Sequence, residues 1–277
     1  MDPMARKPPK KIAGSDPNEP RVYGRNLPSD PRLAGLLVCS HATSRGKLMR
    51  RDLVMVPDGH LEIFLDFRAV AGKKIPMLVG IRPNAIRLKT GRPLDIMGIK
   101  FMPGMFYSLF RASTAAFSKD FIPLSSVIGK AALPFNGVFK ERTPAARMRL
   151  LNAILADCAG KREPMSRELS AALESMYARK GRITVGEMAR TAGWTRRWFL
   201  ETFKKWIGTS PRAFSKNLKF VIAVRELNAG NRPVAAAHEA GYADQPHLNR
   251  AFKSQMGLTP GETFKYKRHR KILPLEP

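Results

Sequence analysis

The sequence predicts an α+β protein in which a small β-rich domain with trailing helices precedes an all-helical domain. Short apolar runs separated by Gly and Pro occupy residues 45–102, which indicates a small sheet or barrel. After Pro103, patterns with helical spacing replace them. Towards the C-terminal end one phrase occurs twice, which predicts two copies of one helical unit joined by a linker helix.

Length and composition divide the chain into four segments. At 277 residues it is long enough for two domains. Residues 1–30 are Pro-rich, charged and poor in large apolar side chains, so we expect a disordered basic arm. We expect residues 31–160 to form the β-rich domain, residues 161–271 the helical domain, and residues 272–277 a tail.

Turn signals and spacing place the elements of the first domain. Strands are expected in four short apolar runs bounded by Gly or Pro, at 53–67, 76–81, 85–90 and 94–101. Helical spacing then predicts helices within 104–113, 123–129 and 143–160. The sequence AGKREP at 159–164 interrupts the pattern, and the segment after it is typical of helix.

The formal net charge of +27 is far more than solubility requires, and it implies a polyanionic partner. Nucleic acid is the first candidate and an anionic membrane surface the second. Basic side chains are concentrated between Ala178 and Arg225, where the only acidic residues are Glu187 and Glu201. The apolar runs are too short to cross a bilayer and the first residues lack the apolar stretch of a secretory leader, so we expect a cytoplasmic protein.

Few residues in the sequence are candidates for chemistry. Cys39 and Cys158 lie far apart without a CxxC pair, so we expect neither a zinc site nor a disulfide framework. Asp58, His60 and Glu62 in VPDGHLEIF invite a metal-site interpretation, but without an HxH pair a turn before a strand is the better one. We therefore expect no catalytic residue, no metal and no cofactor.

The repeated phrase predicts two helix-turn-helix units. AGWTRRWFLETFKKWIGTSP and AGYADQPHLNRAFKSQMGLTP align Phe203 with Phe252 and Gly208 with Gly257, so apolar and backbone-special positions recur. A short apolar helix and a Gly turn precede each longer helix. The longer helices are expected at 195–207 and 244–256, starting from the N-cap residues Thr195 and Asp244.

Each longer helix has one apolar face. In the first, the stripe that begins at Phe199 includes Trp206, while Trp198 lies at its edge. A helix from Arg212 to Ala229 is expected to join the units and to be about 27 Å long, close to the roughly 34 Å between successive major grooves of DNA. The stripe of the second longer helix is expected to be Leu248, Ala251, Phe252, Gln255 and Met256.

With these features the sequence resembles AraC/XylS-type bacterial transcriptional regulators. The similarity covers about residues 166–267, through ITVGEMARTAGWTRRWFLETFKKWIGTSP and, most specifically, AAAHEAGYADQPHLNRAFKSQMGLTPGETF. It implies a sequence-specific DNA-binding regulator that inserts two recognition helices into successive major grooves. VPDGHLEIFLDF and GIKFMPGMFYSLF resemble, more weakly, a regulatory domain of one branch of the family, which implies a cupin-like domain that binds a small effector or dimerises.

The resemblance also implies that early positions in each recognition helix read bases and that nearby polar and cationic side chains bind phosphates. Leu200 and Glu201 depart from the polar or basic residues of many members, and they suit a thymine methyl group and a cytosine amino group. The expected base readers are Arg196, Arg197, Leu200, Glu201, Gln245, His247, Asn249 and Arg250. The expected phosphate contacts are Thr195, Lys204, Lys205 and Lys253.

Double-stranded DNA is the expected partner, and no membrane is expected. Further candidate partners are RNA polymerase, a small-molecule effector at the N-terminal domain and a second copy of the chain. Activation of transcription on the nucleoid is the expected effect, with repression left open. Two other interpretations stay open: a DNA-tethered enzyme with a metal-dependent or repair-type N-terminal domain, and a nonspecific architectural nucleic-acid binder.

Overall fold

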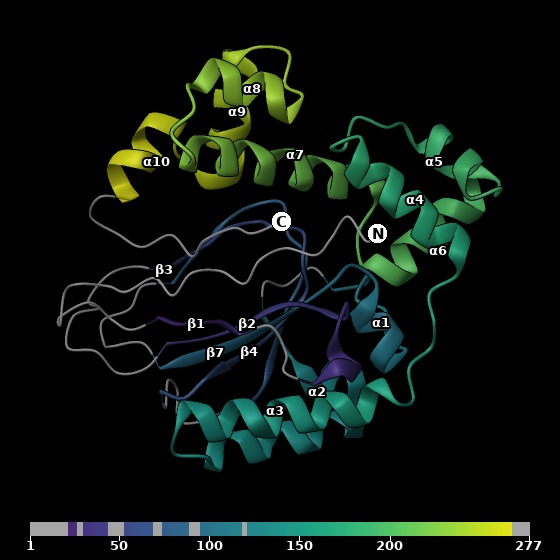
Figure 1. Cartoon of the computed structure of the whole chain (residues 1–277), viewed down its shortest axis with the longest axis vertical. Helices are drawn as coiled ribbons and strands as arrows, with labels where there is room; N and C mark the ends of the chain where they lie inside the picture. Colours follow the sequence, from purple (N-terminus) through teal and green to yellow (C-terminus); the bar gives the residue numbers. More distant parts are fainter. Residues whose placement is uncertain are drawn as a thin grey trace.

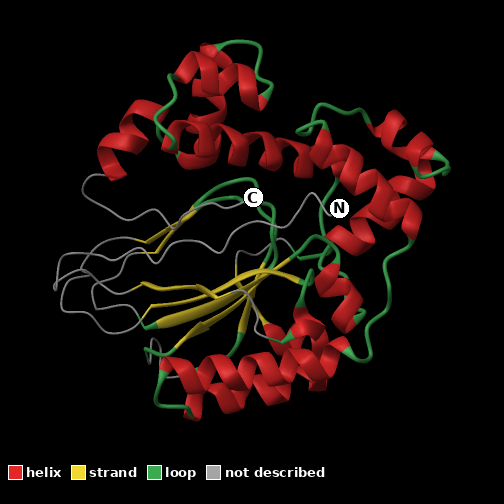
Figure 2. Ribbon diagram, viewed as in Figure 1, coloured by secondary structure: helices red, strands yellow, loops and turns green. Residues whose placement is uncertain are grey.

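The computed structural model describes residues 22–26, 30–43, 53–68, 74–88, 95–117 and 121–267 (Figure 1). An antiparallel sheet lies between a layer of helices and a separate helical domain, which confirms the predicted α+β class (Figure 2). The expected tail and the expected arm lie outside the described residues, except for 22–26 and residue 30. Residues 22–26, within the expected arm, form strand β1 (Val22–Asn26). The strand forms because it pairs with β2 (Leu37–Thr43), and the composition of residues 22–26 does not predict that pairing.

Six strands form the main sheet in the order β1–β2–β7–β4–β5–β8, and every pairing is antiparallel. The central strands β4 (Glu62–Asp66) and β7 (Ile96–Phe101) pair Ile63 with Ile99. Among the described strands β1 and β8 are open edges, so the sheet does not close into a barrel. The remaining strands of this sheet are β2 (Leu37–Thr43), β5 (Met77–Val79) and β8 (Phe121–Pro123).

The central strand β4 is buried on both faces, which explains why its sequence is apolar without alternation. Ile63 and Leu65 belong to the core beneath the helices, whereas Phe64 belongs to a separate cluster on the opposite face. That opposite face carries a two-stranded ribbon of β3 (Leu53–Met55) and β6 (Ile86–Leu88). The covering helices are α1 (Met105–Phe110), α2 (Leu124–Ile128), η3 (Gly129–Lys140) and α3 (Pro144–Ala159).

Helix α7 (Pro211–Asn228) joins the two units of the helical domain (Figure 1). The first unit contains α4 (Arg167–Ala178), α5 (Val185–Thr191) and α6 (Arg196–Ile207). The second contains α8 (Pro233–Ala240) and α9 (Gln245–Met256), followed by α10 (Pro260–Lys267). The bounds expected for the two longer helices and for the connector are thus confirmed to within one residue. None of the described helices is both long and apolar enough to cross a membrane.

The sheet domain contacts both units of the helical domain. The rings of Tyr107 in α1 and Trp206 in α6 lie 4.6 Å apart between centroids. On the other unit, Val56 follows β3 and is part of the core that α7, α8 and α9 build. Between these contacts, a Cβ added at Gly59 would lie 3.6 Å from Asn217 of α7, which shows how closely that turn approaches the connector. The sheet domain therefore contacts both units and also the connector between them.

Substitutions at glycines test the contact between the end of α6 and the sheet domain. Gly208 has a φ of +89°, and a Cβ added there would collide with Thr114 Oγ1 of the sheet domain; Gly230 has a φ of +90° and open space around it. Gly230→Ala should therefore cost about 1–2 kcal/mol of unfolding free energy from the left-handed backbone alone. Gly208→Ala should cost at least about 1 kcal/mol more, because Thr114 must also move. Urea denaturation of both variants measures the difference, and equal losses would contradict the close contact.

Candidate nucleic-acid interface

Local caps position helix α6 in the first unit. Thr184 caps α5 and forms a reciprocal capping box with Glu187, and the backbone N–H of Thr184 lowers the pKa of that carboxyl to about 2. After the turn at Gly193, Thr195 Oγ1 accepts a hydrogen bond from Trp198 N at 3.3 Å and starts α6, as the sequence predicts. The position of α6 is thus set by bonds within about a dozen residues and by its buried apolar face.

The outward face of α6 carries the expected readers and phosphate contacts. Arg196, Arg197, Glu201, Lys204 and Lys205 are exposed, and Leu200 is half-buried. Arg197 Nε donates to Glu201 Oε1 at 3.0 Å, so two of the expected readers bind each other. The i, i+4 spacing of this pair is readable in the sequence. For Arg197 to reach a base, it has to leave Glu201 or contact DNA together with it.

Three other side chains at α6 refine the predictions. Trp206 is buried, as predicted, whereas Trp198 is 57% exposed and lies in the first turn beside the expected readers. The ammonium of Lys205 lies 5.2 Å from the ring centroid of Tyr107, and its hydrogen bond to the Tyr107 hydroxyl oxygen, which stabilises the charged form, raises the pKa of Lys205. Lys205, which the sequence analysis expects to bind phosphate, therefore also contacts the sheet domain.

In the second unit, Asp244 caps α9 and orients His247. Asp244 Oδ1 accepts from His247 N at 2.6 Å, and the Nδ1 of His247 accepts a long hydrogen bond from Ala243 N at 3.5 Å. This tautomer leaves Nε2 of the exposed imidazole as a donor. Arg250 and Lys253 are exposed, and Gln245 and Asn249 are half-buried. The predicted buried stripe is confirmed at every position: Leu248, Ala251, Phe252, Gln255 and Met256.

A direct link between the two units was not foreseen from the sequence. Arg182 Nη2, in the loop between α4 and α5, donates to Glu239 O at 2.6 Å and to His238 O at 3.2 Å, at the end of α8. Lys180 in the same loop forms an ion pair with the Glu239 carboxylate. The connector helix is therefore not the only element that sets the separation of the units. Residues this far apart in the chain leave no local signature of such a contact.

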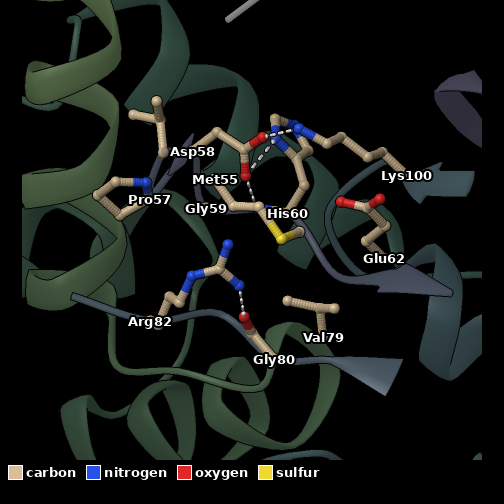
Figure 3. A pocket seen from close by; sticks show the side chains of 11 residues that line it. Met55, Pro57, Asp58, Gly59, His60, Glu62, Val79, Gly80, Arg82 and Lys100 are labelled. Carbon is tan, nitrogen blue, oxygen red and sulfur yellow. Dashed lines mark hydrogen bonds and ion pairs between the residues drawn. The ribbon is translucent and has the colours of Figure 1, made fainter. Parts of the chain in front are cut away.

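The three candidate metal ligands in VPDGHLEIF lie in one charged cluster with Arg82 and Lys100 (Figure 3). Asp58 forms an ion pair with Lys100 and accepts a hydrogen bond from His60 N at 3.1 Å. Burial alone would raise the pKa of Asp58, but the charge of Lys100 and the contact with His60 outweigh it and hold the pKa well below its ordinary value. The turn expected before a strand is present, and β4 follows it.

The cavity at this cluster has a volume of about 10 Å³, room for about one water molecule. An organic effector does not fit there. Within the described ranges, no group of three or more His, Cys, Asp or Glu side chains is arranged to hold a metal ion. The cluster instead stiffens the turn at Gly59 that lies against α7.

Residues 188–266, from α5 into α10, match a family model described as a helix-turn-helix domain. An AraC-like transcription regulator from Streptomyces antibioticus is 33% identical over 87 residues, which is 31% of this chain and 28% of that protein. The RCS-specific HTH-type transcriptional activator RclR of Escherichia coli K12 is 32% identical over 96 residues, which is 34% of each chain. The chain thus spans about a third or less of the length of these relatives, and the similarity concerns their helix-turn-helix regions.

One solved structure with lower similarity is ToxT from Vibrio cholerae. It aligns with 82% of this chain and 93% of its own, at 11% sequence identity and a TM-score of 0.41. Similarity of this size transfers neither a ligand nor a function to the sheet domain.

The Asp58 cluster predicts a defined dependence of stability on pH. Asp58→Asn should lower the unfolding free energy at neutral pH by about 3 kcal/mol, since it removes a buried ion pair with Lys100. The folded pKa of Asp58 is depressed, so its contribution is complete above the unfolded value of about 4 and is lost as the pH falls below it. Urea titrations at pH 7 and pH 3 measure both effects. The control is Asp157→Asn, in an exposed ion pair with Lys161, which should change the unfolding free energy by less than about 1 kcal/mol. If the difference in unfolding free energy between Asp58→Asn and wild type were equally large at both pH values, the depressed pKa of Asp58 would be contradicted.

Proposed function

We propose that this chain, whose C-terminal domain is a helix-turn-helix domain of the AraC type, is a sequence-specific DNA-binding regulator of transcription. The observation that carries the proposal is the pair of recognition helices. Both α6 and α9 start at a capped N-terminus, bury one apolar face and expose basic side chains on the other. One chain thereby presents two such helices on one connector, where most helix-turn-helix proteins need two subunits.

Affinity and specificity would come from different side chains on the two helices. Lys204 and Lys253 extend from exposed positions and suit phosphates, which supply most of the affinity. Arg196 and Arg250 lie nearer the helix starts, where side chains reach base edges, and an arginine fork suits guanine. His247 can donate from Nε2, and the indole of Trp198 can pack on a thymine methyl group or a sugar. Leu200, Glu201, Gln245 and Asn249 complete the proposed set of readers, together with Arg197.

We further propose that the sheet domain modulates DNA binding, through a small effector or through self-association. A cavity of about 460 Å³ lies beside α3 and has the size of an effector site, with Lys140, Arg142 and Arg147 among its lining residues. Helix α3, which contributes Pro144 and Arg147 to the lining, lies on the side of the sheet away from the connector (Figure 1). An effector there would act on the helical domain only through the contacts between the domains. RNA polymerase in the cytoplasm would be the further partner of such a regulator.

Selection of bound DNA from a random pool, with the full chain, tests the proposal. We expect a bipartite motif whose half-sites are about one helical turn, or 10–10.5 base pairs, apart. A single short motif would mean that only one unit reads bases. Recovery of DNA without any preferred sequence would contradict the proposal and favour a nonspecific architectural binder.

Two side chains of α9 separate base reading from phosphate binding. Arg250→Ala should weaken binding to the selected site by about 1–3 kcal/mol and relax the preference at one base pair. Lys253→Ala, on the same helix, is the matched control and should weaken all sequences alike while lowering the slope of log affinity against log salt by about one. Titrations of a library of single-base variants at several salt concentrations measure both. An unchanged sequence preference in Arg250→Ala would remove Arg250 from the readers.

A further inference from the structure

The sheet domain supplies hydrogen-bond donors to the end of the second recognition helix. The last four carbonyl groups of any α-helix have no partner within the helix. At the end of α9, Lys253 O accepts from Gly257 N at 3.0 Å, within the usual glycine stop. The next three carbonyls, of Ser254, Gln255 and Met256, all face one segment of the sheet domain, residues 82–87. We call this the 82–87 segment.

Each of these three carbonyls has its own donor in the 82–87 segment. Ala85 N donates to Gln255 O at 2.7 Å, and Arg87 Nη2 donates to Met256 O at 2.8 Å. Asn84, with its amide oriented so that the nitrogen faces carbonyl oxygens, donates to Ser254 O at 2.9 Å. The guanidinium also places a positive charge at the negative end of the helix dipole. All four terminal carbonyls of α9 are thus satisfied, three of them from another domain.

The 82–87 segment is itself fixed to the connector and to the sheet domain. Arg82 O accepts from Asn217 Nδ2 at 3.1 Å, and Asn217 is 2% exposed in the middle of α7. Downstream, β6 pairs Ile86 with Met55 of β3. A shift of α9 relative to α7 would therefore break bonds at both ends of the segment.

The first recognition helix is held by the same domain at its own C-terminal end. Tyr107 packs on Trp206, and Gly208 lies against Thr114. The expected base readers lie in the opposite halves of the two helices, at their starts. The sheet domain thus holds both recognition helices by the ends that do not enter the groove.

From this geometry we infer that the 82–87 segment positions α9 relative to α6, and so selects the distance between half-sites that the chain binds well. The inference rests on the proposed function. Arg87 is a positioning residue: it lies beyond the end of α9 and acts through the helix, without touching a base. Removing its bond should leave the base preference within each half-site unchanged, and should widen the range of spacings that are bound.

The test uses the full chain and DNA duplexes that carry the two selected half-sites with the spacing changed by one base pair at a time. In wild type one spacing should be preferred. Arg87→Met keeps an apolar side chain of similar length but removes the donor and the charge, and should reduce the ratio of affinities between the best and the next spacing by about fivefold or more. Asn84→Ala combined with Arg87→Met should reduce it further. Arg149→Met, which removes an exposed charge from α3, is the matched control and should leave the ratio unchanged.

Hydrogen exchange of the same variants tests the positioning without DNA. The amide of Ala85 and those of the last turn of α9 should exchange at least about fivefold faster in Arg87→Met than in wild type and in the Arg149→Met control. An unchanged spacing preference in a variant that folds normally overturns the inference, and so does unchanged exchange. If wild type itself shows no bipartite site, the proposed function fails, and the exchange measurement alone decides whether the 82–87 segment positions α9.

Discussion

The four carbonyl groups at the end of α9 are the constraint on which the arrangement of the domains depends. A buried carbonyl without a partner costs about 1–3 kcal/mol, so a helix that ends against another domain needs donors there. Asn84, Ala85 and Arg87 supply them, and they can do so only while the β3–β6 ribbon keeps its place. A two-stranded ribbon is marginal alone. It is stabilised by lying between the sheet, through Met55 and Ile86, and the second unit.

The buried ion pair between Asp58 and Lys100 lies close to the surface that the sheet domain presents to the helical domain. Contacts with the helical domain follow one another from α1 at α6, through the turn at Gly59 against α7, to the 82–87 segment at α9. This ion pair holds the turn at Gly59 in place from inside the sheet domain, and so maintains the contact between that turn and α7. The sheet domain therefore contacts both units directly and, through the turn at Gly59, the connector between them.

The sequence predicts well what depends on neighbours in the chain. The helix starts at Thr195 and Asp244, the helix ends at residues 207 and 256, and the burial of Gln255 follow from N-caps and helical spacing. The structure confirms all of them. The pairing of Arg197 with Glu201 has a readable spacing that the assignment of both as readers overlooked. Strand β1, the Arg182 contacts with α8 and the bond from Asn217 to Arg82 O depend on residues distant in the chain, and no local pattern encodes them. Most of the positions proposed as DNA contacts are exposed, and Leu200, Gln245 and Asn249 are half-buried. Helical spacing shows which side chains share a face, but it does not show which of them read bases.

The length of the connector α7 restricts which insertions and deletions a protein with this architecture can accept. One residue inserted into an α-helix advances everything beyond it by about 1.5 Å and rotates it by about 100°. In this chain, an insertion in α7 between Asn217 and Asn228 would turn α8 and α9 away from Asn84, Ala85 and Arg87 and would also separate Arg182 from Glu239. An insertion or a deletion in the connector would therefore keep these contacts only if residues 82–87 and the loop at Arg182 changed with it. Length variation in related chains should be concentrated in the loops, and α7 should keep its 18 residues.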